Sequence, residues 1–217
     1  MKVDTKGLIP ELSRSELDLI NEVSNHPNVI NVKLKGKGTY GEYLTDFCAA
    51  PAVVGKKNRS GSYDRRVGWV HIGHFAWVDR HGRVHFRPHG TPWDGASKPS
   101  FTNVFLGHTD KIKWLIPSLL HDGMGTDSLF IKWDAELDKP VLYTEDISIW
   151  EGARLMYDAM RDAGSSRWRA QAAKLGLRTF QYVGRLIKGE THWELLSTAP
   201  EYAGAIEDIG KKIRFDK

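Results

Sequence analysis

The chain has 217 residues, of which 41% are hydrophobic and 27% charged, so it is long enough to bury a core as a globular domain. Its net charge of +4 (31 basic against 27 acidic residues) is modest, and no stretch approaches the roughly 18 apolar residues of a membrane span. The first residues lack the apolar stretch of a signal peptide, which favours the cytoplasm. The single Cys48 excludes an internal disulfide and a cysteine-cluster metal site.

The first third of the chain is expected to hold a helix, a strand and basic loops. Ser13 and Glu16 have the spacing of a capping box ahead of an apolar helical pattern, which predicts a helix near residues 14–24. Alternation in "VINVKL" predicts a strand at 29–34. The glycine-rich "KGKGTYGEY" and residues 55–66 are expected to be long loops, and "GKGTYG" lacks the spacing of a nucleotide-binding loop.

Residues 67–90 have the clearest β pattern, with two strands around the turn "DRHG". We expect Phe75, Trp77, Val84 and Phe86 to lie on one buried face of this hairpin. The segment also holds five histidines: His71, His74, His81, His85 and His89. A metal cluster is one interpretation, but their positions beside aromatic residues favour ordinary sheet histidines.

The second half of the chain is predicted to be mainly helical. Thr144 is expected to cap a helix with an apolar stripe that faces the core: Ile147, Trp150, Ala153, Met156, Tyr157, Met160 and Ala163. A second helix over about 166–187 is expected to pack antiparallel to it. Its inward residues are predicted to be Trp168, Ala172, Leu175, Val183 and Leu186. The tail, residues 189–217, is expected to hold one or two short helices.

Charge is distributed unevenly along the chain. Residues 134–151 hold six acidic residues against Lys139 alone, whereas 165–188 hold six basic residues and no acid. The basic residues are Arg167, Arg169, Lys174, Arg178, Arg185 and Lys188. A solvated helix face is the ordinary interpretation of such a band, and phosphate groups or an acidic neighbour are the partners that would suit it. Arg167, Arg169, Lys174 and Arg178 are therefore a candidate surface for an anionic partner, with nucleic acid as the less favoured occupant.

Asp94 and the pair His121–Asp122 are the candidate chemical groups. The apolar pattern of "IKWLIPSLLHD" predicts a helix that stops at Gly123, which places the pair in its last turn. An aspartate at that end is disfavoured by the helix dipole unless a metal or a basic partner compensates it. If the loop that holds Asp94 packs against this helix end, Asp94, Ser97, His121 and Asp122 form a cluster.

Three interpretations of this cluster stay open, and one of them is direct acid/base chemistry by these side chains without a metal. His and carboxylate oxygens suit a divalent ion, which would make Asp94, His121 and Asp122 metal ligands and catalytic residues, with Trp93 and Ser97 as substrate-binding residues. Alternatively, Asp94 caps its own turn and His121 hydrogen-bonds to it as a structural lock. The metal-site interpretation calls for one divalent metal ion, and no other cofactor is expected.

Four segments together resemble domain-of-unknown-function family 1353 of tailed bacteriophages and prophages: "WDGASKP", "LLHD", "ARLMYDAMRDAG" and "RWRAQAAKLGLRTFQYVG". The likeness spans about residues 68–187 and matches the family's D-G-A-S turn and H-D pair. Where the family has an alanine–aspartate pair, this chain has Gly152 and Ala153, and the adjacent Glu151 or Asp146 would have to substitute as the ligand. "LLHDGMG" is also similar to the signature of H-D phosphohydrolases, but the predicted upstream β-hairpin disagrees with their all-helical fold.

The sequence therefore predicts an α+β protein with a small antiparallel sheet followed by a helical C-terminal half. We expect an appendage at 1–66, a core domain at 67–188 and a helical tail at 189–217. The resemblance implies a phage protein made in the host cytoplasm and assembled with other virion proteins. Its cluster would be either a metal-dependent hydrolytic site or the structural lock of a non-enzymatic virion or host-interaction module.

Overall fold

The computed structural model describes residues 7–24, 29–34, 36–57, 62–95, 112–122, 128–188 and 193–198. The fold is an α+β mix, as predicted, but it has two antiparallel sheets instead of one small sheet. Its helices in the described part are α1 (Arg14–Ser24), α3 (Ile112–Asp122), α4 (Ile149–Asp162) and α5 (Arg167–Lys188). None of them is long and apolar enough to cross a membrane.

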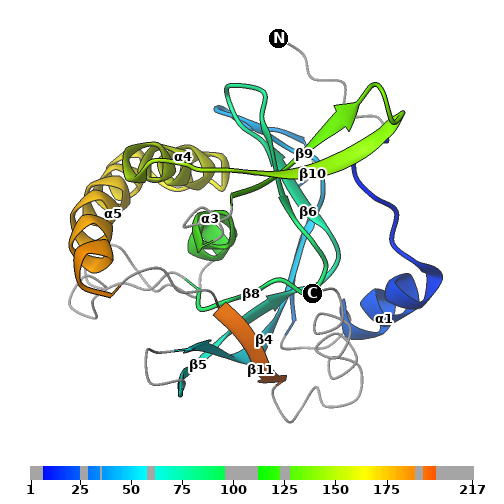
Figure 1. Ribbon diagram of the computed structural model, residues 1–217, viewed down its shortest axis with the longest axis horizontal. Coiled ribbons are helices and arrows are strands. Elements are labelled where there is room, and N and C mark those ends of the chain that lie inside the picture. The colour runs from blue at the N-terminus through cyan, green and yellow to red at the C-terminus, as the bar shows by residue number, and fades with distance from the viewer. Residues whose placement is uncertain are drawn as a thin grey trace.

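The first sheet has the order β1-β4-β5-β8, with β11 also paired to β4. Its strands are β1 (Ile30–Val32), β4 (Phe47–Lys57), β5 (Tyr63–His71), β8 (Pro92–Trp93) and β11 (Trp193–Thr198). The second sheet has the order β10-β9-β7-β6-β3-β2. Its strands are β2 (Gly36–Lys37), β3 (Glu42–Tyr43), β6 (Phe75–Val78), β7 (Val84–Arg87), β9 (Ser128–Asp134) and β10 (Lys139–Glu145). Helix α3 lies between the sheets and the α4–α5 pair (Figure 1).

Helix α1 begins at the predicted capping box. The backbone N–H of Ser13 donates to Glu16 Oε2 at 2.7 Å, and the backbone N–H of Glu16 donates to Ser13 Oγ at 3.3 Å. These reciprocal bonds satisfy N–H groups that have no partner inside the helix. The predicted helix over 14–24 is confirmed.

Strand pairing corrects two expectations, one about residues 55–66 and one about the C-terminal tail. Strands β4 and β5 pair from Ala49↔His71 to Lys57↔Tyr63, so most of the basic segment 55–66 forms a long ladder instead of a loop, and the expected boundary at residue 66 falls inside β5. Residues 193–198 form β11 against β4 instead of a helix. In both cases a neighbouring strand supplies the backbone hydrogen bonds, which local sequence patterns do not reveal.

The β6–β7 hairpin is confirmed, but its predicted buried face is wrong. The register pairs Trp77 with His85 and Ala76 with Phe86, and paired residues lie on the same face of a sheet. Phe75 and Trp77 therefore enter the main core, whereas Val84 and Phe86 pack on the opposite face. Trp77 and Phe86 are both buried because both faces of this sheet are covered.

Helix α3 is the centre of the main core. Its residues Leu115, Ile116, Leu119 and Leu120 are buried against the sheets and α4. Pro117 lies inside the helix and has no N–H to bond the carbonyl of Lys113. The buried Ser165 hydroxyl, which follows α4, donates to that carbonyl at 3.3 Å. A residue of the α4–α5 connection thus replaces the missing helical bond.

Helix α4 starts later than the sequence pattern suggests. Thr144 lies in β10 opposite Leu129, and the N-cap is Ser148, whose hydroxyl accepts from the Glu151 N–H at 3.2 Å. Most of the predicted apolar stripe, including Ala153, Met156 and Met160, is buried. Trp150 is an exception because 64% of it is exposed to solvent.

The carboxylate of Asp162, at the end of α4, holds the glycine-rich segment 38–41. It accepts hydrogen bonds from the Tyr40 backbone N–H at 2.8 Å and from Trp77 Nε1 at 3.3 Å. A Cβ at Gly38 would lie 2.4 Å from Asp162 Cγ, and one at Gly41 would lie 2.3 Å from the carbonyl oxygen of Val78. The glycines thus let the backbone close around an internal carboxylate, where the sequence predicts only a loop.

We expect Asp162→Asn to lower the free energy of unfolding by about 1 to 3 kcal/mol, because the amide NH2 would face a donor in place of a carboxylate oxygen. Urea denaturation measures the change, with the exposed Asp18→Asn in α1 as the matched control. Equal stability of the two variants would show that the bonds to Asp162 contribute nothing.

Candidate functional site

The turn that holds Asp94 lies alongside helix α3. Trp93, immediately before it, is 1% exposed and its Nε1 donates to Ser118 Oγ at 3.1 Å. Gly95, immediately after it, has φ of +77°, and a Cβ there would lie 3.9 Å from Leu115 Cδ2. The loop therefore packs against α3 at Ser118 and Leu115, and its expected packing against the helix end at His121–Asp122 stays a prediction.

Arg87 supplies a positive charge at the carboxyl end of α3. This side chain of β7 is 3% exposed, and its Nη2 and Nε donate to the carbonyls of Leu120 at 3.0 Å and Leu119 at 3.4 Å. Carbonyls at a helix C-terminus lack helical partners and carry partial negative charge. Arg87 is thus the basic partner that a helix ending in His121–Asp122 was expected to need.

The structure tests the predicted Asp94 cluster only in part. His121 and Asp122 occupy the last turn of α3, as predicted, but their side chains and all of Ser97 lie outside the described part. Whether Asp94 meets His121 therefore stays a prediction. Glu151, the substitute metal ligand, lies in a different cluster, where its Oε1 accepts from Arg83 Nη2 at 2.6 Å.

That cluster, around Asp79, was not predicted from the sequence. Asp79 is buried in the β6–β7 turn and accepts from Arg83 Nε at 2.9 Å and from His85 Nε2 at 3.2 Å. Burial alone would raise the pKa of Asp79, but the hydrogen bonds and the charge of Arg83 hold it well below its usual range. Arg83 also bonds Glu151, so the cluster joins the β6–β7 turn to α4. This role is structural.

The remaining histidines of this sheet also have structural partners. The fully buried His71 packs against Phe47 and Phe75, and its Nδ1 bonds the carbonyl of Gly73 at 2.8 Å. His89 Nδ1 accepts from the Gly73 N–H at 2.7 Å. Among the described residues, no group of three or more His, Cys, Asp or Glu side chains is arranged to hold a metal ion.

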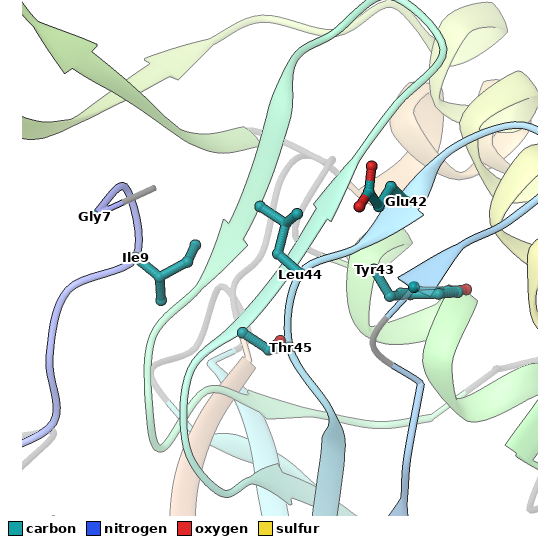
Figure 2. A pocket seen from close by; sticks show the side chains of 7 residues that line it. Gly7, Ile9, Glu42, Tyr43, Leu44 and Thr45 are labelled. Carbon is teal, nitrogen blue, oxygen red and sulfur yellow. The ribbon is translucent and has the colours of Figure 1, made fainter. Parts of the chain in front are cut away.

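A hollow of about 490 Å³ lies between the N-terminal segment and residues 42–45, of which the first two form β3. Ile9 and Leu44 lie on two sides of it (Figure 2). Glu42 supplies the one carboxylate among its described lining residues, while the Tyr43 hydroxyl donates to the carbonyl of Ala159 in α4. Thr45 Oγ1 accepts from the Ala76 N–H at 3.0 Å, so the hydroxyl groups of Tyr43 and Thr45 in this lining both bond to backbone groups.

Helices α4 and α5 form the predicted pair, and aromatic residues line their outer side. Ala170 and Ala173 of α5 pack inward against Met156 and Met160. The predicted inward positions of Trp168 and Leu175 are wrong, because 54% and 53% of these residues are exposed. They are seven residues apart, close to two helical turns, so they lie on the same side of α5.

Basic side chains accompany these exposed residues. The Arg178 guanidinium lies 4.4 Å from the ring centre of Trp150, and that of Arg169 lies 5.4 Å from Trp168. Lys174 Nζ lies 5.5 Å from the ring centre of Tyr157. The later residue of α5, Arg178, thus contacts the earlier residue of α4, Trp150, as expected for an antiparallel pair. Arg167 is exposed, and Arg169, Lys174 and Arg178 are half-buried. None of these four forms an ion pair with a described carboxylate.

We call this surface the outer face of α4–α5, and it consists of Trp150, Arg167, Trp168, Arg169, Lys174, Leu175 and Arg178. The sequence predicted its charges but not its aromatic residues, which the helical period assigned to the core. The available signal was Trp168, which lies between Arg167 and Arg169 in a helix without acidic residues. Comparison with known proteins finds no matching family model, curated protein or solved structure.

The buried His71 is expected to make stability depend on pH. Burial lowers its pKa to about 3, although the bond to Gly73 opposes the shift. Unfolded histidine binds a proton below about pH 6.5, so the contribution of His71 to stability is present above that pH. It is lost as pH falls towards 3, by up to about 1.4 kcal/mol per pH unit.

His71→Asn keeps a donor for the carbonyl of Gly73 but does not titrate. We expect the variant to be less stable at neutral pH and to lose less stability than the natural protein between about pH 6.5 and 4. Urea denaturation over this range measures both slopes. Identical slopes would mean that His71 is not held neutral by the fold.

Proposed function

We propose that the protein is a non-enzymatic assembly module of a bacteriophage particle that binds an acidic protein surface through the outer face of α4–α5. The observation that carries the proposal is the pair of exposed tryptophans, Trp150 and Trp168, each with an arginine over its ring. The phage setting rests on the resemblance of the "WDGASKP" and "LLHD" segments.

Solvent exposure of these groups is unfavourable without a partner. Large apolar side chains gathered on one face leave apolar area in water, and such patches commonly mark interaction sites. Trp and Arg are also the residues that contribute most binding energy when a partner covers them. A covering protein surface with carboxylates would bury Trp150, Trp168 and Leu175 and neutralise the cations beside them.

An acidic protein fits this face better than a nucleic acid. Phosphate backbones are bound by cations that reach out from the surface, often along a groove. Here Arg178 and Arg169 lie over the indole rings, and Arg167 is the one member of the four cations that is exposed and not half-buried. Leu175, in the middle of the face, suits a protein side chain more than a phosphate.

A metal-dependent hydrolytic site at Asp94, His121 and Asp122 is the second candidate function. The bond from Trp93 to Ser118 favours it, because it fixes the residue before Asp94 one helical turn from His121 and Asp122. One divalent ion there would polarise a water molecule for attack on an ester or amide. Arg87 at the same helix end supports the structural lock instead, because it supplies a cation without a metal.

We expect the natural protein to bind poly-L-glutamate, with affinity that falls as salt rises because exposed charges are screened. Arg167→Glu combined with Arg178→Glu should weaken binding by about tenfold or more, since each reversal replaces attraction with repulsion. Tryptophan fluorescence measures the titration. Arg14→Glu with Lys33→Glu, two exposed residues elsewhere, is the control of equal charge change. Equal weakening in the control would contradict a specific face.

The second candidate makes a separate prediction about metal content. If His121 is a ligand, purified natural protein should contain about one divalent ion per chain, and His121→Ala should lose it while the fold survives. Elemental analysis and circular dichroism measure both properties. A metal-free natural protein that loses stability on the same substitution would support the structural lock and exclude the metal site.

A further inference from the structure

The β9–β10 hairpin has an apolar surface that the described residues cover only in part. The N-terminal segment reaches one side of Trp133, since a Cβ at Gly7 would lie 3.7 Å from Trp133 Cζ3. Trp133, Leu137 and Leu142 are 46%, 57% and 50% exposed. Leu142 pairs with Ile131 and lies on the face that Trp133 shares with its partner Pro140, while Leu137 lies in the turn at the tip. Strand β10 is also the last strand of its sheet. Exposed edge strands with apolar side chains tend to pair or pack with another chain.

This hairpin is acidic where the outer face of α4–α5 is basic. Glu136 and Asp138 are exposed at its tip, and Asp134 is half-buried and caps the turn through the backbone N–H of Glu136 at 2.9 Å. Neither Glu136 nor Asp138 forms an ion pair in the described part of the chain. The hairpin thus has three exposed apolar residues beside carboxylates. The outer face of α4–α5 has three exposed apolar residues, Trp150, Trp168 and Leu175, beside cations.

The two surfaces cannot cover each other within one molecule. Figure 1 shows the α4–α5 pair at one side of the fold and the tip of the β9–β10 hairpin projecting at the other. Each molecule therefore has a basic outer face on α4–α5 and an acidic β9–β10 hairpin, on opposite sides of the fold.

We propose that the acidic partner is a second copy of this chain, whose β9–β10 hairpin docks on the outer face of α4–α5. This inference rests on the proposed function and names its partner. Carboxylates of Glu136 and Asp138 would neutralise the cations of α5, and Leu137 and Leu142 would cover Trp168 and Leu175. Burial of both apolar surfaces favours association, and charge complementarity sets its orientation.

Such a contact joins two different surfaces, so it is a head-to-tail interface. Every added copy leaves one hairpin and one outer face free, and association continues until a ring closes or a filament forms. A repeating assembly of this kind is what a structural component of a phage particle would need.

Sedimentation velocity of the full chain tests the inference. We expect the natural protein to form species larger than a dimer as its concentration rises at low salt, and to dissociate at high salt. A face variant, Leu175→Glu with Arg178→Glu, and a hairpin variant, Glu136→Lys with Leu137→Lys, should each be monomeric. Arg14→Glu with Lys33→Glu should associate as the natural protein does.

Mixing the two defective variants is the decisive step. Each retains one intact surface, so together they should form a dimer and nothing larger. This complementation also shows that both variants are folded. A natural protein that stays monomeric, a single variant that still associates, or a mixture that stays monomeric would overturn the inference.

The same variants separate this inference from the proposed function. The hairpin variant should still bind poly-L-glutamate, because its outer face is unchanged. If the natural protein binds poly-L-glutamate but never self-associates, the second copy is wrong and the acidic-protein function stands. If the face binds a poly-dT oligonucleotide and not poly-L-glutamate, both are wrong.

Discussion

The carboxylate of Asp162 is the interaction that fixes how the helical half meets the sheets. It binds the backbone of the 38–41 segment and the indole of Trp77, so it joins an N-terminal loop, the second sheet and the end of α4. Burial raises the pKa of Asp162, and the N–H donors around it oppose that shift. Together with the bond from Ser165 to α3, this contact sets the position of the short connection from which α5 starts.

The outer face of α4–α5 is a consequence of that position. Small residues, Ala170 and Ala173, let α5 approach α4 closely, so the large apolar residues of the helix are left on the opposite side. Trp168 and Leu175 are then exposed beside cations that have no carboxylate partner in the described structure. One side of α5 thus stabilises the core, and the other side is exposed to solvent.

Much of the fold follows from local sequence signals, and the failures share one cause. The capping box of Ser13 and Glu16, the β6–β7 hairpin and the bounds of α3 and α5 were predicted because each depends on neighbouring residues. The inner side of α5, the β4–β5 ladder and β11 depend on distant partners. Apolar periodicity alone cannot decide which of two apolar sides of a helix faces the core.

The candidate chemistry shows the same limit. The helix end at His121–Asp122 was predicted from its glycine stop, and the need for a cation there follows from the helix dipole. Nothing local identifies Arg87, which lies 32 residues before Leu119 and bonds its carbonyl. The Asp79 cluster could not be predicted either, because Arg83 and Glu151 are distant along the chain.

Cysteine cross-linking between two copies tests the central claim most directly. The single native Cys48 is buried, and burial raises the pKa of its thiol to about 11, so it should not react. Leu137→Cys and Leu175→Cys proteins, mixed and treated with a short bis-maleimide, should give a dimer linked between residues 137 and 175. Cross-linked dimers should be scarce when either protein is treated alone. Absence of the 137–175 link in the mixture would contradict hairpin docking on the outer face of α4–α5.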